Sequence, residues 1–283
     1  MLDERLLEII CCPKCKCDLI YEEETKLTCN HCGLEYPLKN GIPVLLIEEA
    51  GQVRPELSIK SRHKHAIKQT FDAYGSSYDE VVHPYFSSRR REEIRKVVGG
   101  KILEVGCGPG TITKGLLDKH DVVAIDISQE MVNVVSQKYN IAGVVADAEA
   151  LPFKPGTFDT VVSGEVIYYL NVPTSLLSES FRVLKQNGTA VISILSQNWV
   201  WVDKIRKWLG KRGMRVGYFD DCYDSTFYGH ELIQMFKIAG FSDVRMQGIV
   251  FLPFAKLDSF NRLLEKSPFH KLAIGLVIWG TKK

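Results

Sequence analysis

The 283-residue sequence predicts an α/β protein built on a doubly wound, mostly parallel β-sheet, with a small metal-binding domain at its N-terminus. Two observations predict the sheet. From residue 102 onward, apolar runs of strand length alternate with helical stretches, and most of these runs end at a glycine or a carboxylate. A third observation predicts the small domain, because six of the eight cysteines lie within the first 32 residues.

The bulk composition is that of an ordinary soluble protein. Hydrophobic residues make up 45% of the chain and charged residues 25%, and the formal net charge is +2. No global charge therefore favours nucleic acid or an anionic membrane. The sequence opens without a secretory signal and contains no apolar run long enough to span a membrane. These features predict a cytoplasmic protein and leave its oligomeric state open.

The N-terminal cysteines predict a zinc site. Cys12 and Cys15 form one C-x-x-C pair, and Cys29 and Cys32 form another after thirteen intervening residues. Each pair suits a tight turn that presents two thiolates, and two such turns on facing hairpins complete a four-sulfur site. A closed set of four ligands leaves no open coordination position, so the expected Zn²⁺ is structural.

The sequence predicts a division into two domains and a linker. Residues 1–49 form the zinc-ribbon domain, and residues 50–67, which lack a clear apolar period, form the linker. Residues 68–283 form the main domain, in which residues 199–229 are an insertion after the fifth strand. The positive side chains of the linker, such as Lys64, are expected to be solvated.

The first strand of the main domain leads directly into a turn with glycine at every second position, Gly106, Gly108 and Gly110. Glycine tolerates positive φ and lets the backbone approach a bound nucleotide closely. A dinucleotide fingerprint requires glycine three residues after the second glycine, where this chain has Thr111. The turn therefore indicates a nucleotide-like ligand other than NAD.

Carboxylates mark the ends of the strands that follow. One strand ends in Asp126, the next is followed by Asp147, and Glu165 comes just after the fourth. Asp126 suits ribose hydroxyls as a hydrogen-bond acceptor, and Asp147 suits the exocyclic amine of adenine. All three positions lie at the carboxyl ends of parallel strands, where ligands bind in this architecture. The expected strands cover residues 122–126, 143–146 and 158–163.

Residues 68–283 resemble class I S-adenosylmethionine (SAM)-dependent methyltransferases with a type 11 domain. The resemblance is carried by ILEVGCGPG, AIDIS, VVADAEALPF and FDTVVSGEVIYYL, in that order. It implies a Rossmann-like sheet of seven strands, the last antiparallel, and SAM as methyl donor. Residues 2–49 resemble the small zinc-ribbon proteins that activate tRNA and release-factor methyltransferases, here fused to a methyltransferase domain.

Carried over residue by residue, the resemblance implies a cofactor site. The glycine turn flanks the methionine moiety, and strand ends further along hold the ribose, the adenine and the methionine amino end. For Ile127, Met131 and Tyr78, packing in the core is the alternative role. The implied set is Glu104, Gly106, Cys107, Gly108, Gly110, Asp126, Ile127, Met131, Asp147, Ala148, Ser163, Glu165 and Tyr78.

The methyl acceptor is expected past the fourth strand, beside Glu165, Tyr168 and Tyr169. Methyl transfer from a sulfonium depends largely on alignment and exclusion of water, and a general base is needed only for a protonated acceptor. This segment is similar to that of quinone-biosynthesis O-methyltransferases. Tyr168 and Tyr169 stand where those enzymes carry Glu and His, so no metal role is implied. Aromatic packing is the alternative role for both tyrosines.

The insertion at 199–229 begins with a basic, tryptophan-bearing stretch of helical period. We favour a lid over a small-molecule pocket, because helices that pack through tryptophan and leave a wet basic face are common. Contact with an anionic membrane surface and a grip on RNA phosphates are the two alternatives.

Three functions compete at this stage. We favour a SAM-dependent methyltransferase acting on a small or lipid-like metabolite. The first alternative is a tRNA or rRNA methyltransferase that uses the zinc ribbon as a docking or activator module, although acidic clusters at 22–24 and 48–49 would repel phosphate. The second is a non-catalytic binding module, which the intact glycine turn, Asp126 and Asp147 disfavour.

Overall fold

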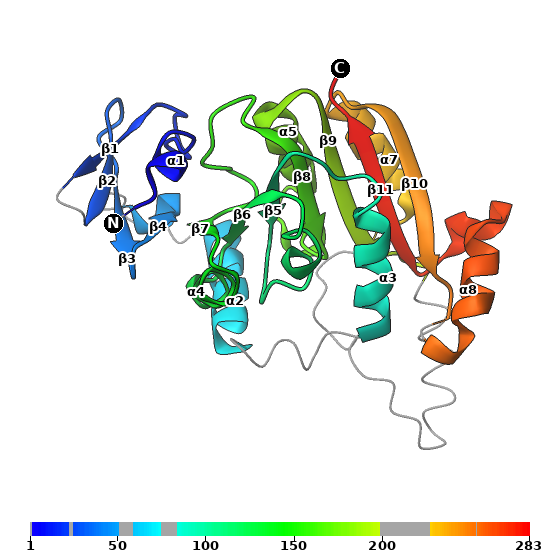
Figure 1. Ribbon diagram of the computed structural model, residues 1–283. Helices are drawn as coiled ribbons and strands as arrows, with labels where there is room; N and C mark the ends of the chain where they lie inside the picture. The colour runs from blue at the N-terminus through cyan, green and yellow to red at the C-terminus, as the bar shows by residue number, and fades with distance from the viewer. Residues whose placement is uncertain (1, 23–24, 51–58, 75–83, 199–226, 253) are drawn as a thin grey trace.

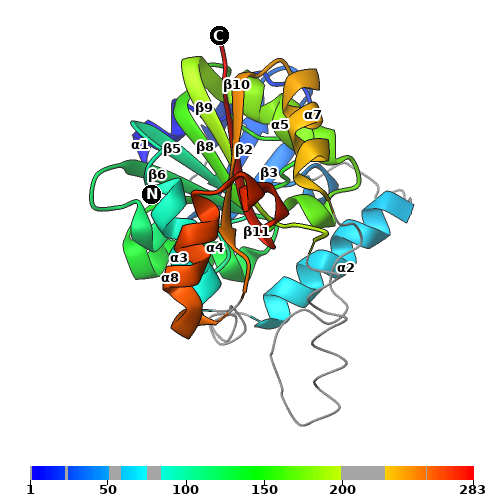
Figure 2. The same ribbon diagram turned by 90° about the vertical axis from the view of Figure 1, so that its right-hand side faces the viewer.

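The computed structural model describes residues 2–22, 25–50, 59–74, 84–198, 227–252 and 254–283. Within these ranges eleven strands form one continuous sheet, with helices on both of its faces (Figures 1 and 2). The strand order is β1-β2-β3-β4-β7-β6-β5-β8-β9-β11-β10. The seven strands from β7 to β10 in this order form the expected Rossmann-like sheet, and β1 to β4 extend it at one edge.

The elements have the following bounds. The strands are β1 Leu19–Glu22, β2 Lys26–Cys29, β3 Glu35–Lys39, β4 Ile42–Leu45, β5 Lys101–Val105, β6 Asp121–Asp126, β7 Ala142–Ala146, β8 Phe158–Gly164, β9 Leu184–Leu195, β10 Ser242–Val250 and β11 Gly275–Thr281. The α-helices are α1 Glu4–Leu7, α2 Ile59–Tyr74, α3 Pro84–Ile94, α4 Gln129–Tyr139, α5 Pro173–Val183, α7 Gly229–Ile238 and α8 Asp258–Glu265. Short 3-10 turns are η1 Ile47–Glu49, η3 Thr113–Gly115, η4 Ile167–Tyr169, η5 Ala255–Leu257 and η6 Pro268–Leu272.

The centre of the sheet is parallel. Strands β7, β6, β5, β8 and β9 run in one direction, and β11 lies antiparallel between β9 and β10, which confirms the expected antiparallel last strand. Ile102, Leu103 and Val105 of β5 are fully buried, as required of a strand with helices on both faces. The carboxyl ends of the parallel strands consequently meet at one edge of the sheet.

The covering helices follow from local signals. Helix α4 packs on β6 and β7. It begins after Ser128, whose hydroxyl accepts the N–H of Met131 at 3.2 Å, and ends at Asn140, which has a left-handed φ of 52°. Such a cap satisfies a backbone donor that the first turn leaves unpaired. Helices α3 and α7 both contact β10 and β11, from opposite faces (Figure 2).

One expected helix is nearly absent. The pattern over 111–119 predicts a helix after the glycine turn, but only the three-residue turn η3 forms. Three consecutive β-branched residues, Thr111, Ile112 and Thr113, and then Gly115 lower helix propensity here.

The N-terminal cysteine-rich segment continues the sheet. Strand β4 pairs in parallel with β7, with Val44 opposite Val145. The N–H of Cys11 donates to the carbonyl of Pro152 at 2.9 Å, and Ile10 forms a bridge with the loop before β8. Buried side chains of the cysteine-rich segment and of the methyltransferase-like sheet belong to the same core cluster.

Helix α2 begins at Ile59, inside the segment 50–67 that the sequence predicts as a linker. The apolar period of this segment is too weak to predict a helix. Contacts with distant parts of the chain stabilise the helix instead, because Lys68 forms an ion pair with Glu49 of η1. The linker therefore covers at most residues 50–58, and the division into domains stays a prediction.

Two predicted features lie outside the described residues, namely Tyr78 and residues 199–226 of the insertion. The chain on the two sides of segment 199–226 comes close together, because Ser196 and Phe227 form a bridge. In the described part of the chain, no helix is long and apolar enough to cross a membrane.

Because the cysteine-rich segment shares the core, we expect Ile10→Ala to weaken the whole chain. Ile10 is 1% exposed, and its truncation should lower the free energy of unfolding by about 2–5 kcal/mol. Urea unfolding followed by circular dichroism measures this, with Ile20→Ala as control, because Ile20 is 50% exposed on β1. If Ile10→Ala left the urea midpoint of the central sheet unchanged, the cysteine-rich segment would fold independently of that sheet.

Candidate cofactor and metal sites

Buried polar side chains gather at the carboxyl edge of the central strands. Glu104 of β5 is 1% exposed, and Asp126 at the end of β6 and Asp147 after β7 are each 9% exposed. Ser163, near the end of β8, is 1% exposed. The topology therefore brings together side chains from four strands that the sequence predicts as one site.

The glycine turn lies at this edge. Gly106, Gly108 and Gly110 have φ values of 72°, 49° and 89°. A Cβ on Gly106 would lie 2.1 Å from Cγ2 of Val166, and a Cβ on Gly110 would lie 2.3 Å from the ring of Tyr139. Both the backbone angles and the close packing require glycine here.

Asp126 holds the glycine turn to β6. Its Oδ2 accepts the N–H of Gly108 at 3.0 Å, and its Oδ1 accepts the N–H of Ser128 at 3.0 Å. Burial raises the pKa of Asp126 to about 6, although the backbone N–H groups oppose this rise. The carboxylate lies at the strand end predicted to meet the ribose.

Glu104 and Cys107 lie within this buried region. The hydroxyl of Thr113 donates to Glu104, and burial raises the pKa of Glu104 to about 7. Cys107 is 4% exposed, and burial raises the pKa of its thiol well above the usual range. Cys107 therefore stays a neutral thiol at pH 7.

The three apolar residues of the predicted set differ in burial. Met131 is fully buried and Ala148 is 8% exposed, whereas Ile127 is partly buried and packs against a cluster that includes Val44 and Val145. These contacts agree with core packing, the alternative role for Ile127 and Met131.

Lys64 joins the site from α2. It forms ion pairs with Asp147 and, at 2.7 Å, with Glu149. Its side chain is 20% exposed, so the expectation of a solvated charge was wrong for Lys64. The available signal was the i, i+4 spacing of Lys64 and Lys68, which places both on one side of a helix. The three paired residues help to line a cavity of about 300 Å³, together with Pro13, Leu45, Ile47, Glu48, Ala150, Asn171 and Val172.

Glu165 and Arg90 form an ion pair at the end of β8, in which Arg90 is buried and the Glu165 side chain is 19% exposed. Arg90, on α3, is 5% exposed, and its Nη1 lies 3.5 Å from Oε1 of Glu165. Glu165 has a φ of 61°, a left-handed conformation that costs a non-glycine residue about 1–2 kcal/mol. Burial raises the pKa of Glu165 to about 7, against the opposing charge of Arg90. The sequence did not single out Arg90, because it stands in a run of three arginines on a helix of weak amphipathic period.

Several buried polar atoms near this pair have no hydrogen-bond partner within the described ranges. They include Nε of Arg90, Oε1 of Glu165 and Oγ of Ser193, and also Oγ of Ser163 in β8. A Cβ on Gly164, the residue before Glu165, would lie 3.2 Å from Oγ of Ser193 and 3.5 Å from Nη1 of Arg90. Because buried polar groups are normally paired, this cluster indicates a place for a ligand group that carries both donors and acceptors.

The two tyrosines of η4 have different surroundings. Tyr168 is 1% exposed, and its hydroxyl donates to the carbonyl of Leu195 at 2.8 Å. These contacts support the packing role for Tyr168. Tyr169 meets the ring of Phe71 edge-on at 5.4 Å, so it lies where α2 crosses the end of the sheet.

The four predicted cysteines come together. The Sγ atoms of Cys12, Cys15, Cys29 and Cys32 all lie within 4.8 Å of one another, with 3.7 Å between Cys12 and Cys32 and 3.4 Å between Cys15 and Cys29. Four thiolates at about 2.3 Å from a tetrahedral Zn²⁺ are about 3.7 Å apart, so the donor set fits this ion.

Tyr36, which the sequence analysis did not predict to be part of the metal site, lies beside the sulfur cluster. The hydroxyl of Tyr36, fully buried, lies 3.2 Å from Sγ of Cys12. Cys29 Sγ accepts the N–H of Cys32 at 3.5 Å. Such donors stabilise thiolate ligands from outside the coordination sphere.

The edge as a whole fits SAM. The glycine turn brings backbone close to any ligand there, and Asp126 offers a carboxylate beside it. The Arg90–Glu165 pair with its unpaired atoms is complementary to an amino-acid end that carries a carboxylate and an ammonium group.

Comparison with known families agrees with both parts of the chain. A methyltransferase domain of type 11 matches residues 103–192, and the Trm112p-like protein family matches residues 3–41. A UPF0434 protein of Nitrosococcus oceani is 48% identical over 59 residues, which are 20% of this chain and 100% of that protein.

The methyltransferase part has named relatives. The demethylmenaquinone methyltransferase of Lactiplantibacillus plantarum is 24% identical over 222 residues, 68% of this chain and 94% of that protein. The 2-methyl-6-phytyl-1,4-hydroquinone methyltransferase 1 of Oryza sativa is 29% identical over 184 residues, 61% of this chain, and the chain spans about half (52%) of its length. The crystal structure of a SAM-dependent methyltransferase of Thermotoga maritima shares the fold, with a TM-score of 0.59 and 21% identity over 77% of this chain and 100% of that one.

The raised pKa of Glu104 predicts a pH-dependent stability of the ligand-free protein. Folded Glu104 holds its proton up to pH about 7, whereas the unfolded side chain loses it near 4.5. The contribution of protonated Glu104 to the free energy of unfolding is therefore fully present below pH 4.5 and is lost as the pH rises through 7, by an amount on the order of 3 kcal/mol.

Glu104→Gln should remove much of this loss. We expect its melting temperature to fall less than that of the unsubstituted protein between pH 4.5 and pH 8, because Gln carries no ionisable proton. Glu130→Gln, at an exposed position of α4, is the matched control. Parallel pH profiles for Glu104→Gln and the unsubstituted protein would contradict the buried-acid assignment.

Proposed function

We propose that this chain, a SAM-dependent methyltransferase with a type 11 domain behind a Trm112p-like segment, methylates a small or lipid-like metabolite. The single observation that carries the cofactor assignment is the Arg90–Glu165 pair with its buried, unpaired polar atoms, beside a glycine turn held by Asp126. SAM supplies a methyl group on a sulfonium, which needs alignment more than further activation.

The amino-acid end of the cofactor would lie between Arg90 and Glu165. The guanidinium would bind the carboxylate, and Glu165 would accept from the ammonium group. The 3.5 Å separation of the pair is longer than a good hydrogen bond, so each partner has capacity left for a ligand. Ser193 Oγ, unpaired among the described residues, adds one more polar contact.

The nucleoside end would lie over β6 and β7. Asp126 would accept from ribose hydroxyls and Asp147 from the adenine amine. Asp147 is already paired with Lys64, but Lys64 keeps Glu149 at 2.7 Å as a second partner. Lys64 can therefore release Asp147 to the adenine without becoming an unpaired buried charge.

The four-cysteine cluster would hold a structural Zn²⁺. Its four sulfur donors complete a tetrahedral shell, so no coordination position is left for a substrate. Strand β4, which follows the second pair of cysteines, joins β7 in the central sheet. The metal would thus fix the edge of the sheet beside Asp147.

The acceptor is proposed to be a small or lipid-like molecule for two reasons. The relatives from Lactiplantibacillus plantarum and Oryza sativa cited above are named as methyltransferases of quinone-type compounds. Helix α2 also closes over the end of the sheet, with Phe71 packed on Tyr169, which suits a compact acceptor.

A binding experiment separates the two ends of the cofactor. Arg90→Met should weaken S-adenosylhomocysteine at least 10-fold in calorimetry but leave methylthioadenosine, which lacks the amino-acid end, within about 3-fold, because a charge-assisted pair contributes roughly 1.5–3 kcal/mol. Asp126→Asn should weaken both ligands. Asp121→Asn, at the exposed opposite end of β6, should weaken neither. Equal losses of both ligands in Arg90→Met would contradict the amino-acid-end assignment.

The acceptor class is tested with tritiated SAM and a total extract of cells. We expect the purified protein to transfer label to organic-soluble or small water-soluble compounds. Asp126→Asn should reduce this transfer in parallel with its weaker cofactor binding. Label that nuclease treatment releases from RNA would overturn the metabolite proposal in favour of an RNA substrate.

A further inference from the structure

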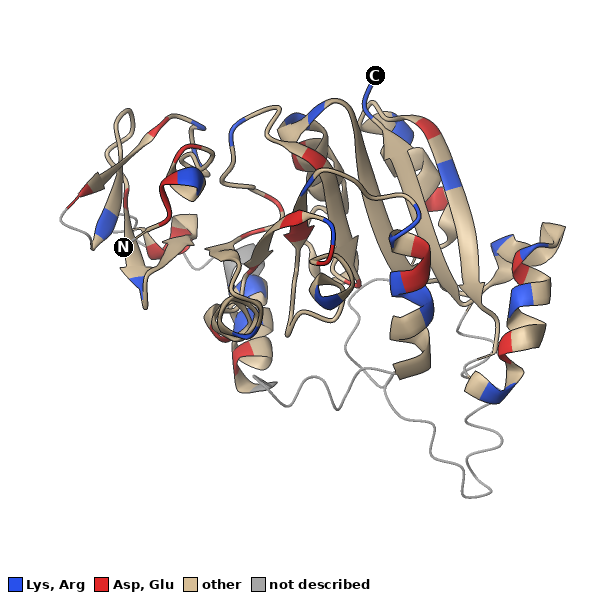
Figure 3. Cartoon of the chain, in the orientation of Figure 1, with Lys and Arg blue, Asp and Glu red and all other residues tan. Residues whose placement is uncertain are grey.

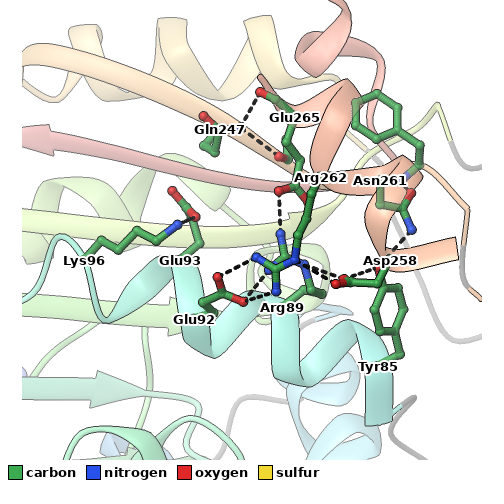
Figure 4. Close-up of polar contacts among 12 residues, drawn as sticks. Tyr85, Arg89, Glu92, Glu93, Lys96, Gln247, Asp258, Asn261, Arg262 and Glu265 are labelled. Carbon is green, nitrogen blue, oxygen red and sulfur yellow. Dashed lines mark hydrogen bonds and ion pairs between the residues drawn. The ribbon is translucent and has the colours of Figure 1, made fainter. Parts of the chain in front are cut away.

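Helix α8 is amphipathic, and it turns its polar side toward the protein (Figure 4). Asp258, Asn261, Arg262 and Glu265 recur at helical spacing along this side. Together with the α3 residues they face, they form a polar network between the two helices. Surface helices normally bury their apolar side instead.

The network accounts for the inward orientation. Arg262 pairs with Glu92 at 2.9 Å, and Glu265 pairs with Arg89, which is 3% exposed. Asn261, fully buried, donates to the hydroxyl of Tyr85 at 2.9 Å. These bonds fix α8 against α3, so rotation of the helix to bury its other side would break several buried polar contacts.

The opposite side of α8 is an exposed apolar patch. Leu257, Phe260 and Leu263 follow one another every three residues and are 38%, 47% and 66% exposed. Adjacent segments extend the patch with three more exposed side chains. The whole patch comprises Phe254, Leu257, Phe260, Leu263, Phe269 and Leu272. Because η5 and η6 contact α8, these exposed side chains lie in one region of the protein, and a group of exposed apolar side chains of this kind marks an interaction surface.

The patch has a positive rim. Lys256, Lys266 and Lys271 are exposed, and they form no ion pair with any residue that the structure describes. Figure 3 shows Lys and Arg in blue along α8 and the segments beside it. The two acidic residues of this region, Asp258 and Glu265, belong to the inward network. The exposed surface between 254 and 272 is therefore mainly apolar and positive. Asp258 is its one acidic side chain with substantial exposure among the described residues, at 35%, and it is paired with Arg262.

The patch lies at the functional edge of the sheet. Strand β10 runs parallel to β9, because both are antiparallel to β11. Helix α8 follows the end of β10 and so lies at the same edge as the glycine turn (Figure 1). Its partner α3 also carries Arg90. A surface docked on α8 would therefore lie on the side from which an acceptor reaches the site.

We propose that α8 and η6 dock this protein on an anionic lipid bilayer. Aromatic and leucine side chains would enter the acyl–headgroup boundary, and the three lysines would meet the anionic headgroups. A second copy of the chain fits less well, because it would bring two positive rims together.

Vesicle flotation tests this surface without cofactor or acceptor, so its outcome is independent of the proposed methyl transfer. We expect the full chain to float with phosphatidylcholine vesicles that contain 30% phosphatidylglycerol, and to bind pure phosphatidylcholine at least five-fold less. The double variant Phe260→Ser/Leu263→Ser and the triple variant Lys256→Gln/Lys266→Gln/Lys271→Gln should each reduce the bound fraction at least five-fold.

The control is Ile238→Ser. Ile238 is 78% exposed on α7, at the other end of β10 from α8, and its substitution should leave flotation unchanged. Equal urea midpoints would show that the variants are folded. The proposal is overturned if the unsubstituted chain does not float, or if the bound fraction is the same with and without phosphatidylglycerol. It is overturned as well if Phe260→Ser/Leu263→Ser floats like the unsubstituted chain. It is also overturned if sedimentation shows a dimer that Phe260→Ser/Leu263→Ser dissociates.

Discussion

The parallel direction of β5, β6, β7 and β8 is the constraint on which the rest of the structure depends. It brings the ends of these strands to one edge, and burial there keeps Glu104, Asp126 and Glu165 in an environment that disfavours their charged forms. Backbone N–H groups and Arg90 offset part of that cost. A site with buried acids and unpaired polar atoms is less stable without its ligand, a common compromise between stability and function.

The same edge explains how the N-terminal segment acts on the site. Strand β4 extends the sheet at β7, and η1 follows it with Glu49 in contact with Lys68 of α2. Helix α2 in turn places Lys64 on Asp147. A continuous series of contacts therefore links the cysteine-bearing hairpins, through β4 and η1, to the position of α2 beside Asp147.

Local spacing was sufficient to predict the glycine turn, Asp126 and the four cysteines, because the chemistry of each depends on neighbours in the sequence. The β4–β7 pairing could not be predicted in this way, because it joins residues about a hundred positions apart. Arg90 and Lys64 were missed for the same reason, since helices at a distance deliver them to the site. The inward orientation of the polar side of α8 could not be predicted either, because amphipathic spacing does not reveal which side of a helix faces the protein.

A crystal structure with S-adenosylhomocysteine bound would test the central claim most directly. We expect the amino-acid end between Arg90 and Glu165, the ribose hydroxyls at Asp126, and Lys64 retained on Glu149 while the adenine amine meets Asp147. Density for the amino-acid end elsewhere, with Arg90 and Glu165 still paired to each other, would contradict the claim that this pair is the cofactor's recognition site.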